Sequence, residues 1–169
     1  MNFKIGIIGC GLIGYKRAKS LGPKGKLVAC ADPNISQANR IVRNKKVKIF
    51  TNWKKLLEIK EIDIIIISTY HNQLSKILLH AYKKKKHVLV EKPGAKNLKE
   101  ISKLISKVNN NKIKIRVGFN HRYHPSIIKA LKIIKSGVIG KPMYLRGRYG
   151  HGGRLGYEKE WRAKPSISG

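Results

Sequence analysis

The sequence predicts an α/β protein built on a Rossmann-type, doubly wound parallel sheet. Three observations support this prediction. Short apolar runs alternate with helical patterns along most of the chain, a glycine-rich turn follows the first run, and an aspartate ends the second. Strands that alternate with helices indicate crossover connections and hence a parallel sheet. We expect a dinucleotide-binding domain over residues 1–119, and over residues 120–169 the truncated start of a second, α+β domain.

The first strand and the turn after it predict a dinucleotide site. Residues 3–8 are a mostly apolar run, residues 9–14 fit G-x-G-x-x-G, and residues 15–21 read as a helix. In this motif the first glycine permits a tight turn, the second lets a pyrophosphate approach the backbone, and the third lets helix and strand pack closely. The predicted cofactor-binding residues of the loop are Gly9, Gly11, Leu12, Ile13 and Gly14. A glycine turn with a purely structural role is the alternative.

The second apolar run, residues 27–31, ends in Asp32, which lies 18 residues after Gly14. This spacing is close to that of the acid that binds the adenosine ribose in dinucleotide-binding domains. A carboxylate there accepts hydrogen bonds from the ribose hydroxyls and repels a 2′-phosphate, so NAD is the predicted cofactor. A positive neighbour could still accommodate the phosphate, which leaves NADP open. The alternative for Asp32 is a turn acid before Pro33.

The remaining elements follow from the same alternation. Strands are predicted at residues 47–50, 63–68, 87–90 and 113–118, and helices at 36–44, 53–58, 72–83 and 97–108. Ser36 is the predicted N-cap of the first of these helices and Asn97 of the last. Beyond them, residues 124–136 read as a helix that ends at Gly137, residues 142–149 as an alternating strand, and residues 150–169 as a loop. The unbroken run 63–68 suits the centre of the sheet.

The formal net charge of +30 makes nucleic acid or an anionic membrane a partner to consider. However, 29 of the 38 basic residues are lysines, and they are spread along the chain, whereas base readout prefers arginine. We therefore expect no specific nucleic acid and attribute the charge to an A/T-rich genome, with a nucleic-acid-binding basic protein as the minor alternative. Residues 83–86, four lysines, read as a solvated helix end.

No apolar run is long enough to span a membrane and no signal peptide is apparent, so a cytoplasmic protein is expected. Cys10 and Cys30 do not have the spacing of a metal site and are expected to be free core thiols. His121 and His124 are three residues apart, but no carboxylate or cysteine accompanies them, so no metal site is predicted.

The pattern resembles the glucose–fructose oxidoreductase/inositol dehydrogenase family of NAD(P)-dependent sugar oxidoreductases. Four features carry the resemblance. They are the glycine loop 9–14, the segment Thr69-Tyr70-His71-Asn72, the tripeptide Glu91-Lys92-Pro93, and residues 118–125. The resemblance covers essentially the whole chain, but only about the first half of a typical member. The sequence departs from the family pattern at Tyr70, where the family usually has proline, and at Leu74, where histidine is common.

The resemblance implies roles for individual residues. Lys92 is the implied catalytic residue, since the family lysine lies beside the nicotinamide and hydrogen-bonds the substrate. Glu91 would orient Lys92 or contact the cofactor. Thr69 and His71 are further cofactor candidates, with a polar helix start as the alternative for His71. Substrate binding is implied for Asn120, Arg122 and Tyr123, with an ordinary polar loop as the alternative. Residues 151–154 and 161–162 would also face the substrate.

In the family, the acid/base histidine follows a glycine-rich segment. Residues 161–169 resemble only the stretch that leads into that segment, so no residue of this chain is assigned the acid/base role. The expected function is the nucleotide-binding portion of an oxidoreductase that transfers hydride between a sugar or sugar-nucleotide alcohol and nicotinamide. A non-catalytic NAD-binding fragment of a truncated gene is the alternative. A sugar-type small molecule is the expected partner, and a homo-oligomer is expected only for a full-length family member.

Overall fold

The computed structural model describes residues 2–42, 46–109, 112–148, 150 and 155–169. Within them, six parallel strands form one sheet in the order β3-β2-β1-β4-β5-β6. The strands are β1 (Phe3–Ile8), β2 (Gly25–Ala31), β3 (Lys48–Phe50), β4 (Ile64–Ile67), β5 (His87–Val90) and β6 (Ile115–Val117). The strand order reverses between β1 and β4, and this is the point where open α/β sheets bind their ligands. The predicted Rossmann-type sheet is confirmed.

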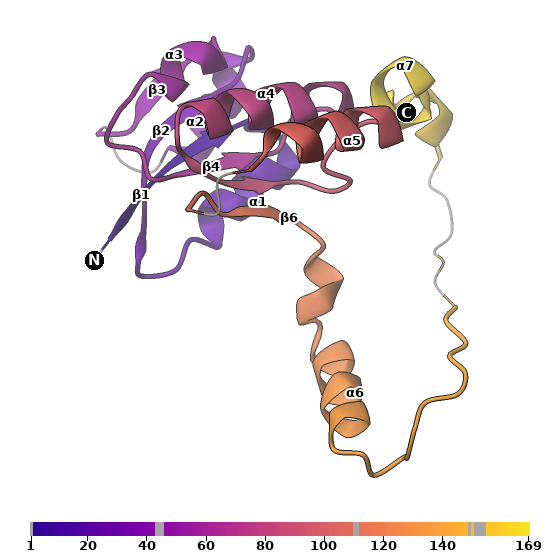
Figure 1. The fold of residues 1–169 in the computed structure, drawn as a ribbon. Coiled ribbons are helices and arrows are strands. Elements are labelled where there is room, and N and C mark those ends of the chain that lie inside the picture. Colours follow the sequence, from indigo (N-terminus) through magenta and orange to yellow (C-terminus); the bar gives the residue numbers. More distant parts are fainter. Residues whose placement is uncertain (1, 43–45, 110–111, 149, 151–154) are drawn as a thin grey trace.

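Helices cover both faces of the sheet (Figure 1). They are α1 (Leu12–Lys19), α2 (Ile35–Ile41), α3 (Trp53–Leu57), α4 (His71–Lys83) and α5 (Leu98–Lys107). Helices α3, α4 and α5 pack on one face and helices α1 and α2 on the other. Strand β4 serves both layers, because Ile65 and Ile67 face the first and Ile66 faces the second. A strand buried on both sides reads as an unbroken apolar run.

Asparagine side chains begin three of these helices. Oδ1 of Asn97 accepts a hydrogen bond from the backbone N–H of Glu100 at 3.0 Å, which confirms the predicted cap. Asn52 caps α3 in the same way. The prediction of Ser36 as the cap of α2 is wrong: Oδ1 of Asn34 accepts from the backbone N–H groups of Ser36 and Gln37, so α2 begins earlier. It ends at Ile41 rather than at residue 44, and residues 43–45 lie outside the described part.

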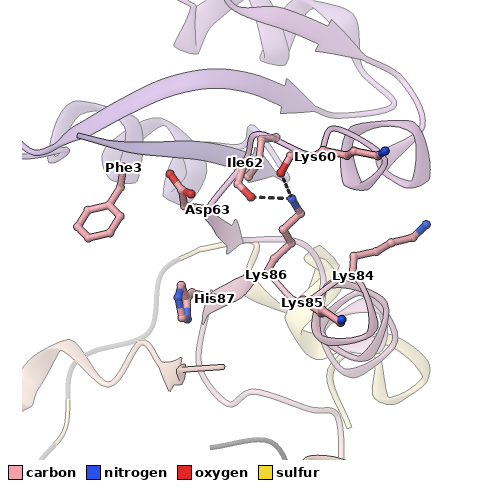
Figure 2. A pocket seen from close by; sticks show the side chains of 8 residues that line it. All are labelled: Phe3, Lys60, Ile62, Asp63, Lys84, Lys85, Lys86 and His87. Carbon is pink, nitrogen blue, oxygen red and sulfur yellow. Dashed lines mark hydrogen bonds between the residues drawn. The ribbon is translucent and has the colours of Figure 1, made fainter. Parts of the chain in front are cut away.

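The interpretation of residues 83–86 as a solvated helix end is wrong for Lys86, which is only 7% exposed. Lys85 adopts the left-handed conformation (φ 57°) and turns the chain, so that the Lys86 N–H reaches the Ala81 carbonyl at 3.1 Å. The Lys86 ammonium then donates hydrogen bonds to the carbonyls of Ile59, Lys60 and Ile62 at 3.0, 2.7 and 2.7 Å. Figure 2 shows the bonds to Lys60 and Ile62. This side chain therefore caps the turn that precedes β4.

After β6 the chain leaves the sheet (Figure 1). It forms the short helix η1 (Asn120–Tyr123) and then α6 (Pro125–Lys135), which carries exposed apolar side chains: Ile127, Ile128, Leu131 and Ile133. The predicted strand 142–149 does not form over residues 142–148, and residue 149 lies outside the described part. A strand requires a partner for its backbone hydrogen bonds, and no described strand lies beside this segment.

The last described residues return to α4 (Figure 1). They form η2 (Tyr157–Lys159), η3 (Trp161–Ala163) and α7 (Pro165–Ser168), where the sequence predicts only a loop. The ring of Trp161 lies 5.1 Å from that of Tyr70 and 4.7 Å from that of His71. Across the described residues, each helix is too short or too polar to cross a membrane.

Candidate functional site

The glycine loop joins β1 to α1, and two of its glycines are required by the fold itself. Gly9 has a positive φ of 89°, and a Cβ there would lie 2.6 Å from the backbone of Ser68. A Cβ on Gly14 would overlap the carbonyl oxygen of Gly9. The hydroxyl of Ser68, at the end of β4, donates to the same carbonyl at 2.7 Å. The loop is therefore pressed against β4 at the switch point of the sheet.

Gly11 differs from the other two glycines. Its φ is −62°, and the nearest atom to a Cβ would be the flexible Oε1 of Gln37 at 3.2 Å. The packing of this protein therefore does not demand a glycine at position 11. The first hydrogen bond of α1 runs from the N–H of Tyr15 to the carbonyl of Gly11 at 2.9 Å, so the amides of residues 12–14 have no acceptor within the helix. No described side chain caps them either, and free amides at a helix N-terminus suit a bound phosphate.

Asp32 lies beside this loop. Its Oδ2 accepts a hydrogen bond from the backbone N–H of Cys10 at 2.7 Å, and its Oδ1 accepts one from the N–H of Asn34 at 2.8 Å. Two backbone amides thus fix the carboxylate next to the second residue of the glycine motif. Each oxygen keeps a lone pair for a further donor, as a ribose diol would require.

Both cysteines are free and buried, as predicted. The Cys10 thiol points to the carbonyl of Ala31 at 3.6 Å. The pKa of Cys10 is raised by its hydrogen bond with the Cys30 thiol, and burial and the negative charge of Asp32 act in the same direction. Cys10 is therefore a protonated packing residue of the loop. The described residues hold no group of three or more metal-ligating side chains.

The segment after β4 places Thr69 and His71 at the carboxyl edge of the sheet. The Thr69 hydroxyl points to the carbonyl of Tyr70 at 3.4 Å. Nδ1 of His71 lies 3.2 Å from the carbonyl oxygen of Ser168, and the Trp161 ring packs edge-on against the imidazole. Burial lowers the pKa of His71, the Ser168 carbonyl opposes this shift, and the charges of Lys92 and Arg162 add to it. Lys92, from the end of β5, is therefore near His71.

Asn72, the next residue on α4, has a buried side-chain oxygen, Oδ1, with no hydrogen-bond partner among the described residues. Buried acceptors in folded proteins are almost always paired. The orphan oxygen lies one residue after His71 and so belongs to the same corner of the molecule. It fits a donor from a bound molecule, such as a hydroxyl or a carboxamide. The sequence offered no signal for it, because a polar residue at a helix start is common.

The Glu-Lys-Pro turn follows β5, and its Lys92–Pro93 peptide bond is cis. The Lys92 side chain is exposed. The Glu91 carboxylate is held by Arg17 of α1, whose Nε donates to Oε1 at 2.6 Å. Sequence reasoning missed Arg17. The two residues are 74 positions apart, and one arginine on the polar side of a helix carries no pattern.

The residues with an implied substrate role lie on η1, just beyond β6. Asn120, Arg122 and Tyr123 are all exposed, and the Arg122 guanidinium lies 5.5 Å from the centre of the Phe119 ring. This segment runs away from the sheet (Figure 1). The predicted substrate loop 151–154 lies outside the described residues, whereas Trp161 and Arg162 lie against the start of α4.

A hollow of about 310 Å³ lies at the opposite, amino-terminal edge of the sheet (Figure 2). Its lining residues are Phe3, Lys60, Ile62, Asp63, Lys84, Lys85, Lys86 and His87. The side chains of Lys60 and Lys84 extend away from Phe3, Asp63 and His87 in Figure 2, and Lys84 is paired with Glu58 at 2.5 Å. The Lys86 ammonium has all three of its protons engaged by backbone carbonyls. These cations do not converge on a ligand, so the carboxyl edge remains the candidate site.

The chain is similar in sequence to known oxidoreductases. Residues 3–119 match the family described as "Oxidoreductase family, NAD-binding Rossmann fold". The chain is 32% identical over 148 residues to scyllo-inositol 2-dehydrogenase (NAD(+)) of Bacillus subtilis. The matched region covers 83% of this chain and 42% of that protein. It is 27% identical to levoglucosan dehydrogenase of Pseudarthrobacter phenanthrenivorans, with 98% of this chain and 43% of that protein covered.

A similar solved structure is that of myo-inositol dehydrogenase from Lactobacillus casei in complex with NAD(H) and myo-inositol. The TM-score is 0.78 at 26% sequence identity, and the match covers 84% of this chain and 44% of that one. The chain thus spans less than half of the length of the curated relatives described here. With the family match extending over most of the chain and the glycine loop at the switch point of the sheet, this protein belongs to the oxidoreductase family that has an NAD-binding Rossmann fold.

Proposed function

We propose that this chain is the cofactor-binding part of an enzyme that transfers hydride between NAD and a secondary alcohol of a sugar or polyol. The observation that carries the proposal is that the first-turn amides of α1, at residues 12–14, have no cap among the described side chains and lie in the same loop that anchors the carboxylate of Asp32. Those amides suit the pyrophosphate, and Asp32 suits the adenosine ribose. The relatives' names, which include inositol and levoglucosan dehydrogenases, support a polyhydroxylated substrate.

The remaining predicted residues take roles around the reacting end of the cofactor. NAD supplies the hydride acceptor when it is bound. Thr69 and His71 would border it from the end of β4, and Lys92 would hold the substrate hydroxyl through its ammonium group. A positive charge at that oxygen stabilises the negative charge that develops as hydride leaves. Asn120, Arg122 and Tyr123 would contact the other hydroxyls from η1.

A general base must also take the hydroxyl proton, and such a group typically contributes about 10²–10⁴-fold to the rate. The described residues include no histidine to which we assign that role. We therefore expect cofactor binding from this chain and turnover only with further protein. We also propose that the protein is cytoplasmic and that a full-length member of the family forms a homo-oligomer. A non-catalytic NAD-binding protein is the second candidate, because none of the described residues is assigned the role of the general base.

Titration calorimetry with NAD and NADP tests the proposal, with two glycine variants of the same size change. Gly11→Val places a side chain in the proposed phosphate space. Gly22→Val is the control, since no atom lies within 4 Å of a Cβ there. We expect NAD binding by the wild type and by Gly22→Val and none by Gly11→Val, with equal circular dichroism. A folded wild type that binds neither nucleotide would overturn the proposal.

The same preparation gives a second, one-sided test, in which NAD reduction is measured with myo-inositol and with levoglucosan as substrates. Turnover that disappears in Lys92→Met would support the enzyme over the non-catalytic candidate. NAD binding without turnover is expected of both candidates for the chain alone.

A further inference from the structure

The ion pair between Arg17 and Glu91 joins the cofactor helix to the turn that carries Lys92. Nε of Arg17 donates to Oε1 of Glu91 at 2.6 Å, and a terminal nitrogen of the same guanidinium contacts the same oxygen. The two side chains are only 27% and 14% exposed. Hydrogen bonds between two charged groups are shorter and stronger than neutral ones, and the fork of an arginine also fixes their direction.

Backbone groups enclose this pair on the carboxyl edge of the sheet. A Cβ on Gly118 would lie 3.0 Å from Nη2 of Arg17 and 3.3 Å from both carboxylate oxygens of Glu91. The N–H of Gly118 donates to the carbonyl of Val90 at 2.7 Å, which holds this cover in place. The Glu91 carboxylate therefore has little freedom to turn toward a ligand, and its position is set by Arg17.

The backbone of Glu91 begins the turn that carries Lys92. Its N–H donates to the carbonyl of Ile67 at 2.9 Å, and its carbonyl accepts from the N–H of Gly94 at 3.0 Å. Lys92 lies between these two fixed points, and its own side chain is exposed. The glycine loop leads into α1, and Arg17 of α1 holds the Glu91 side chain. This contact consequently limits how far the turn with Lys92 can move relative to the glycine loop.

We propose that Arg17 and Glu91 are a positioning pair that sets the turn bearing Lys92 relative to the dinucleotide loop. This inference rests on the proposed function in giving Lys92 its role. Arg17 touches neither cofactor nor substrate in this scheme and acts through Glu91. The Glu91 carboxylate is thereby a tether, in place of the direct cofactor contact considered from the sequence.

Amide hydrogen exchange of the chain without cofactor tests the pair directly. In Arg17→Met the Glu91 side chain loses its partner, and the Gly94 N–H should exchange about tenfold faster, the factor that corresponds to losing a hydrogen bond to a charged group. The Ser68 N–H, which donates to the carbonyl of Ile8 at 2.8 Å, reports the stability of the sheet and should not change. Arg17→Lys, which keeps one cationic donor, should restore part of the protection.

Arg116→Met is the matched control, because Arg116 is an exposed arginine on β6 and its loss changes the net charge equally. Unchanged Gly94 exchange in Arg17→Met would overturn the inference. Equal acceleration at Gly94 and Ser68 would also overturn it, since that is the signature of global destabilisation. Repeating the experiment with NAD separates the two proposals: a wild type that fails to bind NAD contradicts the proposed function, while exchange in the free chain still decides the role of Arg17.

Discussion

The backbone N–H of Cys10 lies 2.7 Å from Oδ2 of Asp32 and donates a hydrogen bond to it, so the acid after β2 is fastened to the middle of the glycine loop. The carboxylate therefore has a structural partner as well as its proposed ligand. A substitution at Asp32 changes both the hydrogen bond to Cys10 and the proposed contact with the ribose. The experiment must therefore distinguish a loosened loop from a changed preference between NAD and NADP.

Asp32→Asn should lower NAD affinity by about tenfold and raise the affinity for NADP relative to NAD, because the negative charge that repels a 2′-phosphate is removed while one amide acceptor remains. The ratio of the two dissociation constants from calorimetry gives the result. Asp63→Asn is the control, because it removes the same charge from a carboxylate that also accepts a backbone hydrogen bond. That bond comes from the N–H of Lys4 at 2.7 Å, at the opposite edge of the sheet. An unchanged ratio in Asp32→Asn would refute the ribose role.

Packing of the last residues on α4 should depend on pH through His71. Its pKa in the folded chain is lowered from 6.5, chiefly by burial, so the unfolded chain binds more protons in the interval below 6.5. Stability from this contact is therefore complete above pH 6.5 and is lost as the pH falls through the lowered pKa. Fluorescence of Trp161 should report the loss as the pH falls below 6.5 and should stay constant above it.

That titration is best performed in a Trp53→Phe background, because Trp53 is the other of the two tryptophans in the chain and would add its own fluorescence. His71→Asn in the same background should remove the transition. A transition of the same size in His71→Asn would show that another group controls the packing.

Lys86→Met should destabilise the fold by about 3 kcal/mol, because three backbone carbonyls lose their donor at once. Lys84→Met supplies the comparison, since Lys84 is exposed and its pair with Glu58 lies at the surface, where such pairs contribute about 0–1 kcal/mol. Urea unfolding followed by circular dichroism measures both. Equal midpoints for the two variants would contradict the buried role of Lys86.

Lys85→Gly should stabilise the protein by about 1 kcal/mol, because Lys85 ends α4 in the left-handed conformation that a side chain disfavours. Lys84→Gly is the matched variant, since the φ of Lys84 is −82° and glycine brings no relief there. Thermal unfolding should show a higher midpoint for Lys85→Gly alone. A lower midpoint would mean that the Lys85 side chain contributes more than its backbone strain costs.

Much of the domain could be predicted from the sequence because its signals are local. The strand at His87–Val90 follows from four consecutive residues, and the cap at Asn97 from its place before an amphipathic run. The glycine loop carries its structural demands in its own spacing. For elements of this kind, a residue's neighbours in the sequence are also its neighbours in space.

Features that depend on distant partners could not be predicted. Arg17 and Glu91 are 74 positions apart in the sequence, and only the folded sheet brings them together. Lys86 is indistinguishable in the sequence from the three lysines before it. The alternation over residues 142–148 has the pattern of a strand, but backbone pairing requires a second strand, and none is present there in the described chain. Local pattern sets a preference, and the partner decides the outcome.

The exposed apolar side chains of α6 have a consequence for the behaviour of this chain in concentrated solution. Each molecule carries a net charge of +30, so mutual repulsion holds these helices apart at low ionic strength. At physiological salt the repulsion extends only about 8 Å, which lets apolar surfaces on neighbouring molecules meet. We therefore expect the colloidal stability of the isolated chain to fall as salt is added, a reversal of the salting-in seen with many proteins.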